Sequence, residues 1–255
     1  MKINLKNAQE EFIKYTQNYD LSDENIERKQ KHSLRVMRIS EQIAENMGLN
    51  KEEITLAALI GLLHDIARFE QYTQYKTFRD IDSIDHGDYG AKILEKDIRK
   101  YIVEPQYDEI IIKAVKNHNK YKIEEGLSDK EELFSKIIRD ADKIDIMFET
   151  VDMFWKGKED IIENSTITED VIQQFNQCSL IKRRKGERPE NSINKIIVTI
   201  AFIFDINYKE SFRIIKKEDY INKIFERFNI KDKYTKNEAE KIRTNANEYI
   251  NKKSI

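Results

Sequence analysis

The sequence predicts an all-α protein, and its composition and its periodicity both support this prediction. The 255 residues include only 7 glycines and 2 prolines, whereas average usage would give roughly 18 and 13 at this length. The tight turns of sandwiches, barrels and propellers depend on these two residues, so the composition argues against such folds. Apolar residues recur at helical spacing, and no stretch alternates cleanly between apolar and polar side chains.

Capping residues mark where several of the helices begin. Gly48 follows one periodic stretch, and Asn50 with Glu53 forms a capping pair that opens the next stretch. Ser128 with Glu131 repeats this pattern. In chain order, the predicted helices cover residues 6–18, 24–47, 51–66, 87–100, 108–119, 129–155, 168–178, 190–203, 208–226 and 236–252.

Two stretches in the second half of the chain bear on its organisation. Residues 196–204 are apolar apart from one threonine and could form a short strand, but their length also suits a buried helix, which we prefer. Residues 182–190, KRRKGERPE, are typical of a surface loop rather than a binding patch. We therefore expect a functional core over residues 1–155 and a helical C-terminal part over residues 156–255, packed on the same core.

The charge balance and the lack of an export signal limit the classes of function. The 45 basic and 47 acidic residues give a net charge of -2, so no chain-wide positive field attracts nucleic acid or an anionic membrane. The N-terminal residues contain no apolar signal-peptide run, and residues 196–204 are too short to span a bilayer. Cys178 is the single cysteine, which excludes an internal disulfide. We expect a cytoplasmic protein with no membrane partner and no stable nucleic-acid partner.

All four histidines lie in the first half of the chain, and each belongs to an apolar helical stripe: His32, His64, His86 and His118. A single histidine on such a stripe is commonly a core residue whose nitrogens are hydrogen-bonded. Burial of four imidazoles in one core is costly unless their nitrogens are satisfied, and a divalent metal satisfies neutral imidazole directly. The set therefore predicts a metal site.

Carboxylates complete the predicted site. Asp65 directly follows His64, and the predicted helix 129–155 carries Asp140, Asp142 and Asp145. Mixed nitrogen and oxygen ligands suit manganese, iron, cobalt, nickel or zinc. Asp140 and Asp142 flank the apolar stripe of that helix and Asp145 lies near its centre, so periodicity alone does not choose the ligand. Asp145 could orient a histidine from outside the ligand set, or pair with a nearby lysine.

Taken in order, His32, the adjacent His64 and Asp65, and Asp142 within the sequence ADK resemble the signature of the HD-domain metal-dependent phosphohydrolase superfamily, an all-helical fold. The resemblance spans residues 25–150. It implies that these four residues bind one metal, which favours Asp142 over the other aspartates of its helix.

The residues around the central pair strengthen the resemblance. LLHDIARF is similar to the LLHDIGKF or LLHDIGRF of many members, with Ala67 where glycine is usual. Some members add two histidines, which here are His86 and His118, and by that analogy Asp65 bridges two metals. The implied cofactor is one or two divalent ions of Mn, Fe, Co, Ni, Zn or Mg. The GYP element of the cyclic-dinucleotide phosphodiesterases is missing.

The resemblance implies a phosphohydrolase that uses metal-activated water on a phosphomonoester or phosphodiester. The expected partner is a small phosphorylated substrate such as a nucleotide, and Asp65 and Arg68 are the predicted catalytic residues. Arg68 could neutralise the transferring phosphate, or form a salt bridge with a local carboxylate. A diiron oxygenase would use the same ligands, and a non-catalytic regulatory module would hold a structural metal; both remain alternatives.

The segment that follows the central pair, FEQYTQYKTFRDIDSID over residues 69–85, mixes aromatic and basic side chains. Such a mixture could stack a base and reach phosphates, as a lid over the site. The alternative is an aromatic-rich loop packed on the helices. The five side chains concerned are Tyr72, Tyr75, Lys76, Phe78 and Arg79.

Overall fold

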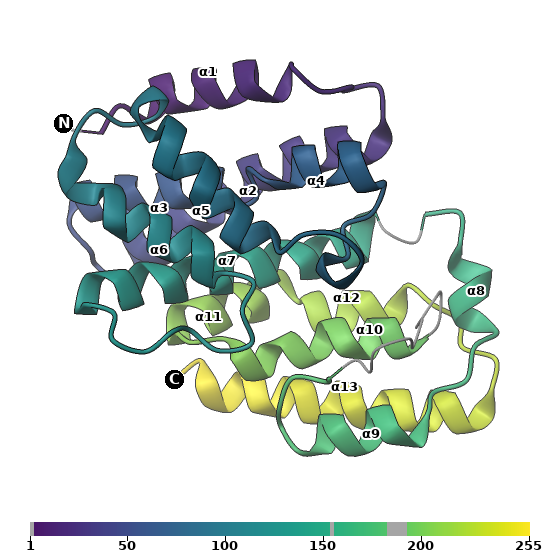
Figure 1. Ribbon diagram of the computed structural model, residues 1–255. Coiled ribbons are helices and arrows are strands. Elements are labelled where there is room, and N and C mark those ends of the chain that lie inside the picture. The colour runs from purple at the N-terminus through teal and green to yellow at the C-terminus, as the bar shows by residue number, and fades with distance from the viewer. Residues whose placement is uncertain (1–2, 154–155, 183–192) are drawn as a thin grey trace. The chain divides into compact units, whose positions relative to one another are not determined.

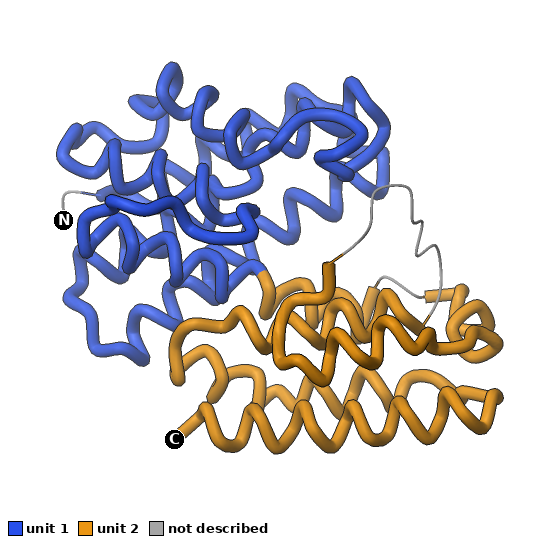
Figure 2. Tube along the Cα trace, turned by 60° about the horizontal axis from the view of Figure 1, so that its bottom comes forward, with its two compact units in different colours: residues 1–142 blue, residues 143–255 orange. Residues whose placement is uncertain are grey.

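The computed structural model describes residues 3–153, 156–182 and 193–255 (Figure 1). These residues form helices and contain no strand, which confirms the all-α prediction. The chain divides into two compact units, residues 1–142 and residues 143–255 (Figure 2). In the described part of the chain, no helix is long and apolar enough to cross a membrane.

Unit 1 contains six complete helices and the first part of a seventh among its described residues. They are α1 (Leu5–Thr16), α2 (Glu24–Asn46), α3 (Lys51–Leu63), α4 (Arg68–Tyr75), α5 (His86–Asp97), α6 (Asp108–Asn117) and the start of α7 (Asp129–Asp152). Short 3-10 turns are η1 (Asp80–Asp82), η2 (Ile98–Lys100) and η3 (Pro105–Tyr107).

Unit 2 contains the end of α7 and a set of shorter helices that lead to a long C-terminal one. They are α8 (Glu159–Glu163), α9 (Glu169–Asn176), α10 (Ile193–Ile200), η4 (Ala201–Asp205), α11 (Lys209–Glu218), α12 (Tyr220–Glu226) and α13 (Lys233–Lys253).

The packing of α3 on α2 positions two of the predicted metal ligands. The Asn50 side chain accepts from the backbone N–H of Glu53, and the Glu53 side chain accepts in return, so the predicted capping pair opens α3. Helices α2 and α3 meet at Gly61, where a Cβ would lie 2.7 Å from Ser40 Oγ and 2.8 Å from the Val36 carbonyl oxygen. This close approach requires glycine, and it brings the end of α3 to the middle of α2.

The structure corrects several predicted helices. Residues 208–226 form two helices instead of one, because Asp219 takes a left-handed conformation with φ of 55° between α11 and α12. Helices α4 and α8 were not predicted. Residues 193–200 form the predicted helix rather than a strand. The predicted surface loop at residues 182–190 lies, from residue 183 onward, outside the described residues.

Unit 2 is held together by an apolar core and a few directional contacts. Isoleucines dominate its buried side chains, and Ile197 and Ile224 are fully buried. Arg227 donates to the Val151 carbonyl and to Glu159 Oε1, which ties α12 to the segment around α8. The Thr235 hydroxyl accepts from the backbone N–H of Ile167 at 3.1 Å, which fixes the start of α13.

Candidate metal centre

The first set of donors in unit 1 joins three parts of the chain. His32 comes from α2, His64 and Asp65 follow α3, and Asp142 comes from α7. His32 Nε2 lies 3.2 Å from His64 Nε2 and 3.1 Å from Asp142 Oδ1. Asp65 Oδ2 lies 3.4 Å from His32 Nε2 and 3.6 Å from His64 Nε2. The structure therefore brings these four predicted residues together.

The second set of donors uses the other oxygen of the same carboxylate. His86 begins α5 and His118 follows α6, and their Nε2 atoms lie 3.0 Å apart. Asp65 Oδ1 is 3.5 Å from His86 Nε2 and 3.6 Å from His118 Nε2. Asp65 thus presents Oδ2 to one pair of histidines and Oδ1 to the other pair.

Hydrogen bonds at Nδ1 fix the direction of three imidazole rings. His64 Nδ1 donates to the Gly61 carbonyl at 2.8 Å, and His118 Nδ1 donates to the Val115 carbonyl at 2.6 Å. His86 Nδ1 lies 2.6 Å from a carboxylate oxygen of Asp80 and donates to it. Since the proton is on Nδ1 in each ring, Nε2 carries a lone pair that faces the cluster.

This arrangement fits divalent ions. In the second set, two Nε2 lone pairs and one carboxylate oxygen face one another, and a divalent cation between them would satisfy all three. Ligand atoms about 2.1 Å from one ion lie about 3.0 Å apart as octahedral neighbours and about 3.4 Å apart in a tetrahedral site. The separations between 3.0 and 3.7 Å in both sets agree with this spacing.

The electrostatic environment favours the protonation states that bind metal. Burial would raise the pKa of Asp65, but Lys29, His64 and Arg68 outweigh it and hold this pKa well below the usual range. Burial lowers the pKa of His64, and burial together with the charge of Arg68 lowers the pKa of His86 to about 3. Ionised carboxylates and neutral imidazoles are the forms that coordinate a divalent ion.

Two cations contact the shared carboxylate directly. Lys29 Nζ donates to Asp65 Oδ2 at 2.8 Å, and the Lys29 side chain is only 12% exposed. Arg68 Nε donates to Asp65 Oδ1 at 3.3 Å. Arg68 also donates to Asp80 Oδ1 and to the Phe78 carbonyl, so it forms the local salt bridges that the sequence left as an alternative. A contact between Arg68 and a phosphate stays a prediction.

Sequence reasoning missed Lys29 and Asp80. Lys29 lies three residues before His32, on the same side of α2, and this helical spacing could have found it. Asp80 lies in a stretch without helical periodicity, and no pattern in the sequence distinguishes it. Asp145 is fully buried one turn after Asp142 on α7, and its role as an orienting carboxylate stays a prediction.

The segment after α3 is partly helical, and its aromatic side chains contact one another. Tyr72 on α4 stacks on Phe78 with ring centroids 4.7 Å apart, and Tyr75 is exposed. The Phe78 ring also lies 5.4 Å from Lys29 Nζ and 5.7 Å from the Arg68 guanidinium carbon. The packing of Tyr72 on Phe78 agrees with the alternative of a packed loop.

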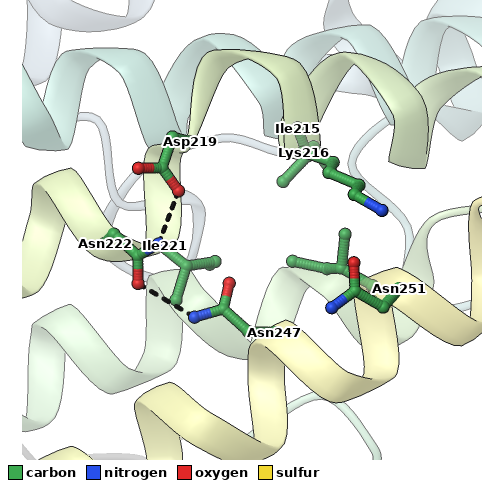
Figure 3. Close-up of a pocket in the computed structure, with 8 residues that line it drawn as sticks. Ile215, Lys216, Asp219, Ile221, Asn222, Asn247 and Asn251 are labelled. Carbon is green, nitrogen blue, oxygen red and sulfur yellow. Dashed lines mark hydrogen bonds between the residues drawn. The ribbon is translucent and has the colours of Figure 1, made fainter.

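Unit 2 contains a separate pocket of about 400 Å³ between α11, α12 and α13 (Figure 3). Three of its polar side chains are hydrogen-bonded to one another: Asn222 Nδ2 donates to Asp219 Oδ1 at 2.6 Å, and Asn247 Nδ2 donates to Asn222 Oδ1 at 2.9 Å. The lining of this pocket includes none of the donors predicted from the sequence.

Comparison with known families agrees with the cluster in unit 1. Residues 30–147 match the family model described as HD domain, a stretch that includes all six donors. This part of the chain is thus similar to an HD domain, which confirms the resemblance. HD domains bind divalent metals, and the family consists mostly of metal-dependent hydrolases. Neither the curated proteins nor the solved structures gave a match to this chain.

Proposed function

We propose that this protein is a metal-dependent phosphohydrolase that cleaves a phosphomonoester or phosphodiester of a nucleotide or a similar small metabolite. The observation that carries the proposal is the position of Asp65 between two pairs of histidines, with one carboxylate oxygen facing each pair. An arrangement of this kind suits two divalent ions that share one carboxylate.

The residues of the first donor set are His32, His64, Asp65 and Asp142, and those of the second are His86, His118 and Asp65. When bound there, divalent ions supply positive charge that polarises phosphoryl oxygens and make water acidic enough to attack at neutral pH. The protein supplies the geometry, because backbone carbonyls and Asp80 hold the rings with Nε2 toward the cluster.

The positively charged side chains beside Asp65 are an argument that the substrate is an anion. Lys29 and Arg68 each donate to one oxygen of this carboxylate, and Arg28 lies 5.6 Å from the centroid of the Phe78 ring that both of them also approach. Lys29 makes one hydrogen bond through Nζ among the described residues, while its ammonium carries three donors. We assign Lys29 as the side chain that contacts a substrate phosphate, with Arg68 as a candidate second contact.

The experiment is phosphate release by the metal-reconstituted full-length chain from a panel of phosphomonoesters, phosphodiesters and nucleotides. We expect turnover that falls by about a thousand-fold or more in Asp65→Ala. Asp82→Ala is the matched control, because Asp82 is an exposed aspartate of unit 1 that pairs only with Arg79 among the described residues. Equal turnover in Asp65→Ala would contradict the proposal, as would oxygen consumption by the iron-loaded chain without phosphate release.

A further inference from the structure

Asp80, whose side chain is 29% exposed, is the centre of a half-buried polar network that the metal ligands alone do not require. Its carboxylate lies 2.6 Å from His86 Nδ1 and accepts from Gln71 Nε2 at 2.9 Å, from Asn119 Nδ2 at 3.0 Å and from Arg68 Nη1 at 3.2 Å. These partners come from α4, from the start of α5 and from the residues after α6. One carboxylate thus connects three parts of unit 1.

The network reaches every donor of the second set. Asp80 bonds His86 directly, and it connects to Asp65 through Arg68, whose Nε donates to Asp65 Oδ1. It connects to His118 through the neighbouring residue Asn119.

The network is built closely around Asn119. A Cβ at Gly87, the residue after His86, would collide with the side-chain oxygen of Asn119. The start of α5 therefore requires glycine to let Asn119 approach Asp80, and Gln71 is fully buried beside them.

The first donor set has no such connection apart from the shared Asp65. No contact joins Asp80 to His32, His64 or Asp142 among the interactions described for unit 1, and the His64 ring is fixed by the Gly61 carbonyl instead. A change at Asp80 should consequently act on one set of donors and spare the other.

We propose that Asp80 is the positioning residue that determines whether the second metal position, formed by His86, His118 and Asp65, is filled. The carboxylate holds the proton on His86 Nδ1, which turns the Nε2 lone pair toward His118 and makes it a stronger donor. The proposal rests on the two-metal arrangement put forward above. If it holds, a chain with Asp80 binds two ions, and a chain without this carboxylate binds one ion tightly.

The test is titration of the metal-free full-length chain with Co²⁺, which gives the number of equivalents and the dissociation constant of each. We expect two equivalents in the wild type. In Asp80→Asn the second equivalent should bind about 10–100-fold more weakly, while the first should be unchanged. Asp80→Glu, which keeps the charge, should recover part of the affinity, and His86→Ala should lose the second equivalent.

The control is Asp82→Asn, two residues along in the same 3-10 turn, whose carboxylate pairs with Arg79 at 2.9 Å and is exposed. It should bind both equivalents as the wild type does. The proposal is overturned if Asp80→Asn binds both equivalents normally, if it loses both while its circular dichroism stays native, or if the wild type binds only one. If Asp80→Asn does not fold, Asp80→Glu replaces it: the second equivalent should then bind more weakly than in the wild type with the first unchanged, and wild-type binding of both equivalents would overturn the proposal.

The Co²⁺ titration and the phosphate-release assay distinguish failure of the Asp80 proposal from failure of the proposed phosphohydrolase activity. Two Co²⁺ equivalents with the expected Asp80 effect, but no phosphate release from any substrate, would refute the phosphohydrolase and leave the role of Asp80 intact.

Discussion

Unit 1 and the helices of unit 2 beyond α7 bury different kinds of side chain, whereas the part of α7 that belongs to unit 2 also buries Lys143, Asp145 and Glu149. Unit 1 buries four histidines together with Asp65 in one cluster, and the half-buried Asp80 lies beside it; the Asp65 side chain is 3% exposed. Beyond α7, the buried polar side chains of residues 156–182 and 193–255 are the hydroxyls of Thr199, Ser211 and Thr235. Burial of titratable groups costs free energy unless their polar atoms are satisfied. The comparison therefore supports the cluster of unit 1 as the candidate ligand site, whereas the helices beyond α7 are stabilised by apolar packing.

The largest effect is expected at the carboxylate that both donor sets share. Asp65→Ala removes one oxygen ligand from each set and leaves Lys29 and Arg68 without their common partner. We expect the variant to retain less than about a tenth of the bound metal of the wild type. Elemental analysis after reconstitution and desalting measures this, and full metal content in a folded Asp65→Ala chain would remove the basis of the comparison.

A cavity in unit 2 should lower stability without changing metal binding. Ile224 on α12 is fully buried, and Ile224→Ala should reduce the free energy of unfolding by about 2–5 kcal/mol. The number of metal equivalents in the folded protein should remain that of the wild type. Urea denaturation and elemental analysis on the same preparation test both statements; loss of metal from folded Ile224→Ala would show that the two units are not independent in this respect.

The contact between α2 and α3 offers a smaller change that acts inside unit 1. In Gly61→Ala the new Cβ meets Ser40 Oγ, the Val36 carbonyl and the Met37 Cα within 3 Å, and two of these atoms belong to the backbone. We expect a loss of about 1–3 kcal/mol in stability and weaker binding at the first metal position, because α2 carries His32 and His64 follows α3.

The matched control for that change is Gly90→Ala on α5. Its Cβ would meet a side-chain methyl of Val115 at 3.1 Å rather than backbone, so the neighbour can move. The melting temperature of Gly61→Ala should be lower than that of Gly90→Ala. The opposite order would mean that the contact between α2 and α3 tolerates an added Cβ better than the position on α5 does.

The smallest effect is expected at an ion pair on the surface of unit 1. Hydrogen bonds from Lys116 and Lys113 lower the pKa of Glu124 to about 2. A lowered pKa in the folded state stabilises the protein above the unfolded pKa of about 4.3, and this contribution disappears as the pH falls through 2. Because the side chain is 30% exposed, Glu124→Gln should cost no more than about 1 kcal/mol at pH 7.

Urea denaturation of Glu124→Gln and wild type at pH 7 and pH 3 checks the sign. The difference in the free energy of unfolding should shrink at the lower pH, and metal content should be equal at pH 7. A difference that grows toward pH 3 would contradict the ion-pair account.

Much of the fold could be predicted because its signals are local. Helical periodicity and the capping pair at Asn50 and Glu53 placed α2, α3 and the start of α7 close to their observed bounds. The break at Asp219 was missed, because the left-handed residue is an aspartate rather than the glycine that usually marks the end of a helix.

The candidate site likewise contains residues that the sequence predicts and residues that it does not. The six predicted donors stand out because they are rare residue types on apolar stripes or belong to a recognisable motif. Asp80 is one of 47 acidic residues, in a stretch without periodicity, and its contact with His86 depends on how that loop folds back onto α4 and α5. Lys29 could have been found from its helical spacing to His32, but only once that histidine was taken as a ligand.

The central claim is that unit 1 holds divalent metal at two adjoining positions. Elemental analysis of the tag-free, metal-reconstituted chain tests it most directly. The account predicts close to two equivalents of a divalent transition metal per chain. A folded protein that takes up no metal under any reconstitution would contradict it, and the buried histidines would then be structural residues only.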